Sequence, residues 1–410
     1  MSLDPTVSPE DHRTILRGRI VSDGESVTDG LVAIADGRIV YAGAASTFHE
    51  AGFDGVEATP LPEDAVLIPG LVDIHCHGGN GGDFPSGQED SARTAIDFLH
   101  RAGTTSLLAS MVTASREDLL RGIELYVRLS EEGLLSGIHL EGPFLSEARC
   151  GAQNPAYLLN PDLEFAEELI LAAGGQLRTM TYAPELPGAA ELVDLLTMHG
   201  VVPSLGHTDS DDATAAASLA AARDGLSEGG FDGSASRPTV THLFNGMPPI
   251  HHRSPGPITA CLRAAQAGQA AVELIADNTH LDPRTTLTVF TLVGAANVLL
   301  VTDSMAAAGL SDGRYMLGPS PVTVDGGVAT LDATGSIAGG TATLLQVVQR
   351  TVAAGVSLED AVRSATAVPA DVLGLDDEVG SLRRGLRADV VVLDAGLQLA
   401  RVMREGRWLV

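Results

Sequence analysis

The 410-residue sequence predicts an α/β protein, a (β/α)8 TIM-like barrel that carries a small β-sandwich built from both chain termini. Three observations lead to this fold class. Eight short apolar runs alternate with stretches of helical pattern, both chain ends show short segments broken by turn sequences, and polar side chains follow five of the apolar runs. Strand and helix alternating eight times is typical of a barrel rather than of a sandwich or a helical bundle.

The two chain ends are predicted to form the β-sandwich. Between residues 14 and 68, short alternating segments are separated by turn sequences that contain Asp-Gly, and residues 380–410 show similar segments and turns. Asp-Gly between short apolar segments indicates a tight turn, so both ends are expected to consist of strands. We therefore expect residues 1–68 and 380–410 to pair into one domain on which the barrel is mounted.

The barrel is expected to span residues 69–379. Its helices are indicated by apolar residues at the three-and-four spacing of one buried face, for example at residues 92–101 and 116–130. In this fold the active site lies at the C-terminal ends of the strands, so those ends should carry the functional side chains. The predicted strands are residues 71–75, 105–109, 137–141, 178–182, 201–207, 239–243, 272–277 and 298–303.

Histidines and carboxylates gather at the ends of these strands. His75 and His77 lie two residues apart, so both side chains can face the barrel mouth. His139 shares the face of Glu141 at a deeper level and is expected to support the site rather than to bind a metal. Imidazole and carboxylate groups that meet at one rim suit zinc or another divalent ion. The candidate ligands are His75, His77, Glu141, His207, His242 and Asp303.

The composition limits the chemistry and the partners. All 25 basic residues are arginine, which excludes Schiff-base catalysis by lysine and a carbamylated lysine between two metals. The formal charge of −28 opposes binding to nucleic acid and to anionic membranes, and no apolar run approaches the ~20 residues of a membrane span. Three scattered cysteines and an N-terminus without a signal-peptide pattern favour the cytoplasm.

Four motifs at the strand ends carry a family resemblance. They read His-Leu-Glu-Gly-Pro-Phe at 139–144, Leu-Gly-His-Thr at 205–208, Thr-His-Leu-Phe-Asn-Gly-Met-Pro at 241–248 and Val-Thr-Asp at 301–303. With these motifs the chain resembles the amidohydrolase superfamily over nearly its whole length, and within it the deacetylases of amino-sugar phosphates. The resemblance implies metal-dependent deacetylation of N-acetylglucosamine 6-phosphate.

The resemblance also implies how the metal is held. Glu141, His207 and His242 would bind one divalent ion, while His75, His77 and Asp303 would complete a second site. The cofactor would be one or two ions per subunit, with zinc preferred and iron, manganese or cobalt as alternatives. Asp303 would be the general base that takes a proton from the activated water and later protonates the departing amine.

Substrate-binding residues follow from the same resemblance. Arg253 would bind the sugar phosphate through its planar guanidinium group, and in the family the equivalent arginine reaches a neighbouring subunit's site, which implies a homodimer. Gln153 stands where many relatives have a histidine that polarises the substrate carbonyl. The full set is Ala152, Gln153, Asn245, Gly246, Arg253, Asp277, His280, Ile337, Ala338 and Gly339.

Other functions stay open at the level of the sequence. Dihydroorotases and hydantoinases typically use the bridging lysine that this chain lacks. D-amino-acid acylases and deaminases of the superfamily can do without it, and a phosphate site at Arg253, Asn245 and Gly246 separates the deacetylase from them. A non-catalytic scaffold on the same barrel would have lost its metal ligands, whereas all of the proposed ligands are present.

Overall fold

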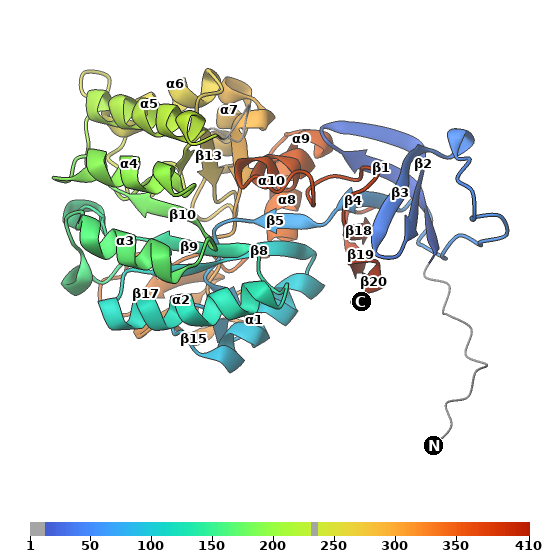
Figure 1. Ribbon diagram of the computed structural model, residues 1–410, viewed down its shortest axis with the longest axis horizontal. Helices are drawn as coiled ribbons and strands as arrows, with labels where there is room; N and C mark the ends of the chain where they lie inside the picture. The colour runs from blue at the N-terminus through green and yellow to red at the C-terminus, as the bar shows by residue number, and fades with distance from the viewer. Residues whose placement is uncertain (1–12, 231–236) are drawn as a thin grey trace.

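Eight parallel strands form the barrel in the computed structural model, which describes residues 13–230 and 237–410 (Figure 1). The residues that follow the first and the last strand are hydrogen-bonded to each other and close the barrel. Asp303 N donates to His75 O at 2.8 Å, and His77 N donates to Ser304 O at 2.7 Å. The predicted barrel is therefore confirmed. In spatial order the strands are β5 (Leu71–Asp73), β8 (Thr104–Val112), β9 (Gly137–Glu141), β10 (Leu177–Tyr182), β11 (Val202–Leu205), β12 (Thr239–Val240), β13 (Ala271–Leu274) and β14 (Val298–Leu300).

Several strands end earlier than the sequence predicts. The backbone at His207, His242 and Asp303 has φ values of 45°, 28° and 45°. Left-handed backbone cannot continue a strand ladder, so the chain turns at these three residues. These three candidate ligands thus lie on turns just beyond their strands, whereas Glu141 is the last residue of β9.

Helices surround the barrel and bury its outer face. The predicted helices at 92–101 and 116–130 are α1 and α2, and the side chain of Ser115 accepts a hydrogen bond from Asp118 N at the start of α2. The helices are α1 (Glu89–Arg101), α2 (Arg116–Glu131), α3 (Leu163–Ala172), α4 (Ala189–Met198), α5 (Asp212–Glu228), α6 (Gly256–Gln266), α7 (Pro283–Val293), α8 (Leu344–Ala353), α9 (Leu358–Ser364) and α10 (Ala367–Val372). Short 3-10 helices occur at Ala45–Thr47, Glu147–Arg149, Pro155–Tyr157 and Ala295–Asn297.

Both chain ends contribute to one seven-stranded sheet beside the barrel, as predicted (Figure 1). Its strands share one core, in which Leu16 and Val32 cluster with Val390 and Met403. The pairing of β1 with β4 is parallel, and the other pairings are antiparallel. The sheet order is β20 (Arg407–Trp408), β19 (Leu399–Arg404), β18 (Val390–Leu393), β4 (Val66–Pro69), β1 (Thr14–Ser22), β2 (Glu25–Ala35) and β3 (Arg38–Ala44).

A three-stranded antiparallel sheet follows the last barrel strand and was not predicted. It consists of β15 (Gly313–Leu317), β16 (Ser320–Asp325) and β17 (Val328–Leu331). Its buried side chains pack with Met305 and with Ala152 of the loop after β9. This insertion, residues 313–331, therefore packs against loops at the barrel mouth. A second small sheet pairs β6 (Gly78–Gly79) with β7 (Gly82–Asp83).

The remaining expectations concern cysteines and membranes. Cys76 and Cys261 are buried, Cys150 is half-buried in a loop, and all three are free thiols. Among residues 13–230 and 237–410, no helix combines the length and the apolar content needed to cross a membrane.

Candidate active site

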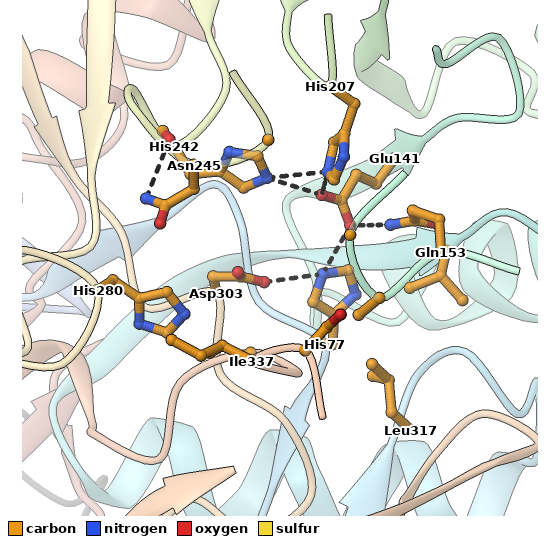
Figure 2. Close-up of a pocket in the computed structure, with 16 residues that line it drawn as sticks. His77, Glu141, Gln153, His207, His242, Asn245, His280, Asp303, Leu317 and Ile337 are labelled. Carbon is orange, nitrogen blue, oxygen red and sulfur yellow. Dashed lines mark hydrogen bonds and ion pairs between the residues drawn. The ribbon is translucent and has the colours of Figure 1, made fainter. Parts of the chain in front are cut away.

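Six candidate metal ligands meet at the barrel mouth in two groups of three. Their ligand atoms lie within 4.8 Å of one another in each group. Figure 2 shows five of the six pointing toward one another from separate strand ends. The groups are Glu141, His207 and His242, and His75, His77 and Asp303.

The first group centres on Oε1 of Glu141. This oxygen lies 2.8 Å from His207 Nε2 and 3.1 Å from His242 Nε2, and the two nitrogens are 3.0 Å apart. Two imidazole nitrogens this close cannot both carry a proton toward each other. The atoms are therefore arranged to share a cation.

The second group also brings two imidazole nitrogens close to a carboxylate oxygen. His75 Nε2 and His77 Nε2 are 3.2 Å apart, and Asp303 Oδ1 lies 3.5 Å and 3.1 Å from them. Oε2 of Glu141 is 3.2 Å from His77 Nε2. One carboxylate thus faces both groups.

Hydrogen bonds on the far side of the rings set the histidine tautomers. Nδ1 of His77 lies 3.0 Å from Ser110 O, and Nδ1 of His207 lies 2.8 Å from Arg149 O. A carbonyl oxygen only accepts, so each Nδ1 carries a hydrogen, and each Nε2 is the nitrogen that faces the mouth and is placed to bind a metal. Lone pairs of nitrogen and carboxylate oxygens that converge in this way fit a divalent metal of the zinc type.

Electrostatics within the site point in the same direction. Burial raises the pKa of Asp303, but the neighbouring His75 and His77 outweigh it and bring the pKa to about 2. Burial lowers the pKa of His77, whereas hydrogen bonds to Asp303 and Glu141 raise it to about 9. The carboxylates therefore favour positive charge here, which a bound metal would supply.

A cavity of about 250 Å³ opens above the ligands. In Figure 2, His280 and Ile337 lie on one side of Asp303, and Leu317 lies on the far side of His77. Seven predicted substrate residues line the cavity: Ala152, Gln153, Asn245, Gly246, His280, Ile337 and Gly339.

Three predicted substrate residues do not line the cavity. Asp277 lies behind His280, with Oδ2 2.8 Å from His280 Nδ1. Ala338 is buried against the insertion after the barrel. Arg253 is exposed, and its Nη1 donates to His252 Nε2 at 2.7 Å. This chain's own cavity therefore contains no arginine among its lining residues.

Gln153 is tied to a metal ligand. Its Nε2 donates to Glu141 Oε2 at 2.7 Å, and its Oε1 accepts from Thr113 N at 2.7 Å. Both ends of the amide are thus engaged, and the side chain fixes the second oxygen of Glu141.

Some residues of the site were missed by the sequence analysis. Glu273 on β13 accepts from the Nδ1 of His75, and it could have been noticed as an acid flanked by apolar residues inside a predicted strand. Ser110, whose carbonyl holds His77, gave no such signal. Nor did the other lining residues, Val112, Gly151, Leu317 and Ser336.

Comparison with known proteins places this geometry in a family. The model described as "Amidohydrolase family" matches residues 66–409. The chain is similar to the N-acetylglucosamine-6-phosphate deacetylase of Bacillus subtilis (strain 168), with 33% identity over 403 residues and 94% of each protein covered. It is also similar to the N-acetylgalactosamine-6-phosphate deacetylase of Escherichia coli O157:H7, with 30% identity over 400 residues, covering 96% of this chain and 98% of the other.

A solved structure agrees over the same length. It is a mutant N-acetyl-D-glucosamine-6-phosphate deacetylase from Mycobacterium smegmatis in complex with N-acetyl-D-glucosamine-6-phosphate. It superposes with a TM-score of 0.87 at 37% identity, covering 97% of this chain and 99% of that one.

Proposed function

The chain belongs to the amidohydrolase family, and from that premise we propose that it hydrolyses N-acetylglucosamine 6-phosphate to glucosamine 6-phosphate and acetate. The reaction would serve amino-sugar catabolism and cell-wall recycling. The observation that carries the proposal is the meeting of Asp303 with two groups of metal ligands at the floor of the cavity. Such a floor suits attack of water on an amide carbonyl.

The ligand groups would hold one or two divalent ions, and we propose zinc. Glu141, His207 and His242 would bind one ion, and His75, His77 and Asp303 the other. A bound ion lowers the pKa of water and polarises the amide carbonyl. The histidine tautomers described above support this assignment, because every resolved Nδ1 contact leaves Nε2 free for the metal.

Asp303 is assigned the proton transfers. Its side chain is 13% exposed, the largest opening among the carboxylates of the two groups, so it can meet a water in the cavity. Its low pKa keeps it ionised at neutral pH. Asp303 takes the proton from the attacking water, and the carbon–nitrogen bond then breaks as the same proton passes to the leaving amine nitrogen.

His280 and the apolar residues of the rim would position the sugar. Asp277 engages Nδ1 of His280, so that Nε2 is the ring nitrogen left to the cavity, and this carboxylate raises the pKa of His280 against the lowering effect of burial. A positively charged imidazole suits the phosphate or a neighbouring hydroxyl. Ile337 and Leu317 offer apolar contact to the faces of the ring.

Arg253 is assigned to the site of a second copy of the chain. It is exposed and follows Ile250 by three residues, and Ile250 lines a groove of about 500 Å³ between α6 and α7, where Ile250 is 49% and Leu292 is 52% exposed. Exposed apolar side chains at a groove are typical of a protein interface. In a homodimer the partner subunit's Arg253 would supply the guanidinium group that is missing from the lining of each cavity, and the net charge of −28 makes such an anchor necessary for a phosphate.

We place the reaction in the cytoplasm. The three unpaired thiols support a reducing compartment, because secreted proteins usually pair their cysteines.

The test is release of acetate from N-acetylglucosamine 6-phosphate by metal-loaded protein. The unphosphorylated sugar and N-acetylgalactosamine 6-phosphate are the comparison substrates. We expect rapid release from the phosphorylated glucosamine derivative and a fall in kcat of roughly 1,000-fold in Asp303→Asn. The metal content of the variant is measured in parallel, because Asp303 is also a candidate ligand. No release from any phosphorylated sugar would refute the proposal.

A further inference from the structure

Glu273 is a buried carboxylate that the reaction above does not use. It lies on β13 and is 2% exposed. Its neighbours in alternation, Ala271 and Ile275, belong to the core inside the barrel, so Glu273 also faces the interior. A carboxylate in an apolar interior is costly in free energy unless it is well paired. Its hydrogen-bond partners therefore indicate its role.

One oxygen of Glu273 contacts both ligand groups. Oε2 lies 2.9 Å from His75 Nδ1, and it accepts from His242 N at 3.1 Å. His75 belongs to the group with Asp303, and His242 belongs to the group with Glu141. A single atom thus holds one ligand of each group.

The two contacts have different consequences. A carboxylate only accepts, so His75 Nδ1 carries the hydrogen and Nε2 presents its lone pair toward His77 and Asp303. The backbone of His242 is held at a φ of 28°, which is unfavourable for a residue with a side chain. The carboxylate of Glu273 stabilises that turn. The main-chain carbonyl oxygen of Glu273 also accepts a hydrogen bond from Leu243 N at 2.9 Å.

We propose that Glu273 is a positioning residue that orients His75 and His242 toward two divalent ions and couples the two metal groups to each other. The inference rests on the proposed function only in taking both groups to be metal sites. A carboxylate behind a metal-binding histidine fixes the ring and increases its basicity. The second site therefore depends on a residue outside its own ligand set.

The experiment is calorimetric titration of chelator-stripped full-length protein with Zn²⁺ in the absence of substrate. The wild type is expected to bind two equivalents. Glu273→Gln keeps the size of the side chain but loses its charge and permits the other tautomer of His75. We expect the weaker equivalent to lose affinity by roughly 10- to 100-fold.

A matched control is Asp389→Asn, at the position directly before β18 of the terminal sheet. Asp389 is also buried, at 4% exposure, but it pairs with Arg387 and accepts from Glu405 N, far from any candidate ligand. Both Zn²⁺ equivalents should bind this variant as they bind the wild type. Circular dichroism monitors the fold, and if Glu273→Gln does not fold, Glu273→Asp replaces it, because the shorter carboxylate cannot serve both partners and should show the same loss.

Coupling is tested in a background without His75. His75→Ala should bind one equivalent, and adding Glu273→Gln should weaken that remaining equivalent through His242. Unchanged affinities in Glu273→Gln, or a wild type that binds only one equivalent, would overturn the proposal. Two well-bound equivalents without acetate release would instead refute the proposed reaction and leave the role of Glu273 intact.

Discussion

At the scale of the residue, Gln153 shows how a side chain outside the ligand set shapes the site. Its amide joins Thr113 N to the second oxygen of Glu141. That oxygen also faces His77, so the carboxylate spans both ligand groups from a fixed position. In this chain the residue therefore supports a ligand, whereas the histidine that many relatives carry was expected to contact the substrate.

Gln153→Leu removes both hydrogen bonds at similar volume. It leaves Thr113 N without its partner and takes one donor from Glu141, and a buried polar group without a partner costs about 1–3 kcal/mol. We expect the free energy of unfolding of the chelator-treated protein to fall by about 2 kcal/mol in urea denaturation. Gln266→Leu, at an exposed position on α6, is the control and should change stability little. Equal effects in the two variants would contradict the role of Gln153.

The candidate metal ligands were predictable residue by residue, but two of their supports, Glu273 and Ser110, were not. His75, His77, Glu141, His207, His242 and Asp303 lie at or next to the C-terminal ends of predicted strands, and a barrel brings all of these ends to one face. Glu273 instead contacts the ligands through the interior of the barrel, and pairings across a barrel interior depend on strand register. Sequence periodicity gives the buried face of a strand but not which residues meet across it.

At the scale of the element, the insertion β15–β17 completes the substrate cavity. Its hydrophobic side packs under the loop that contains Ala152, and the segment after it brings Ser336, Ile337 and Gly339 to the cavity wall. The lining residues near 337 were predicted from the family resemblance, but the sheet was not, because its strands are short and are separated by turns that contain glycine. Short strands of this kind give little periodic signal.

Ile337→Ala tests the contribution of that wall. Ile337 is 40% exposed, so the substitution should leave the stability nearly unchanged while it removes apolar contact with the sugar. We expect KM to rise roughly fivefold with little change in kcat, as for the loss of about 1 kcal/mol of uniform binding. Met316→Ala on β15 is a matched control, because Met316 is 45% exposed and does not line the cavity. An unchanged KM in Ile337→Ala would contradict the assignment.

Helix α1 carries a histidine that should make the fold sensitive to acid. His100 is buried, and burial, with added repulsion from Arg404 and Arg387, lowers its pKa to about 3. In the unfolded chain its pKa is about 6.5, so between these values the unfolded state binds a proton that the folded state does not. Stability is therefore lost as the pH falls below the unfolded pKa.

Between pH 7.5 and pH 5 this group should reduce the free energy of unfolding by about 2 kcal/mol. Urea denaturation at both pH values checks the effect, and His100→Gln should lower the difference by that amount. His199→Gln serves as the control, because His199 is exposed and its removal should preserve the acid sensitivity of the wild type. A wild-type pH dependence in His100→Gln would contradict the prediction.

At the scale of the whole molecule, the position of Arg253 suggests that a single chain does not form a complete substrate site. The family resemblance predicted that this arginine meets the phosphate, and in the structure it is exposed and does not line the cavity of its own chain. The residues that form an interface between two copies of a chain cannot be identified from hydrophobic periodicity or motifs alone. The second subunit was therefore predicted only from the family resemblance.

Mixed dimers test that arrangement. Arg253→Ala and Asp303→Asn should each be nearly inactive alone toward the phosphorylated sugar. After unfolding together and refolding, random pairing should give about a quarter of wild-type activity, because one site of each mixed dimer would combine an intact Asp303 with the partner's intact Arg253. Light scattering establishes the oligomeric state. No recovery of activity would place Arg253 in the cavity of its own chain or outside the reaction.

The strand pairing of the terminal sheet determines the order in which parts of the protein can fold during synthesis. Strand β4 pairs on one side with β1, which the ribosome has already released, and on the other side with β18, which begins only at residue 390. The barrel is synthesised during that interval, while one edge of β4 has no partner. Pairing across so much sequence is slow. Completion of this sheet is thus a late event that follows translation of the barrel, and an interrupted chain would expose an unpaired edge of β4 that can pair with another chain.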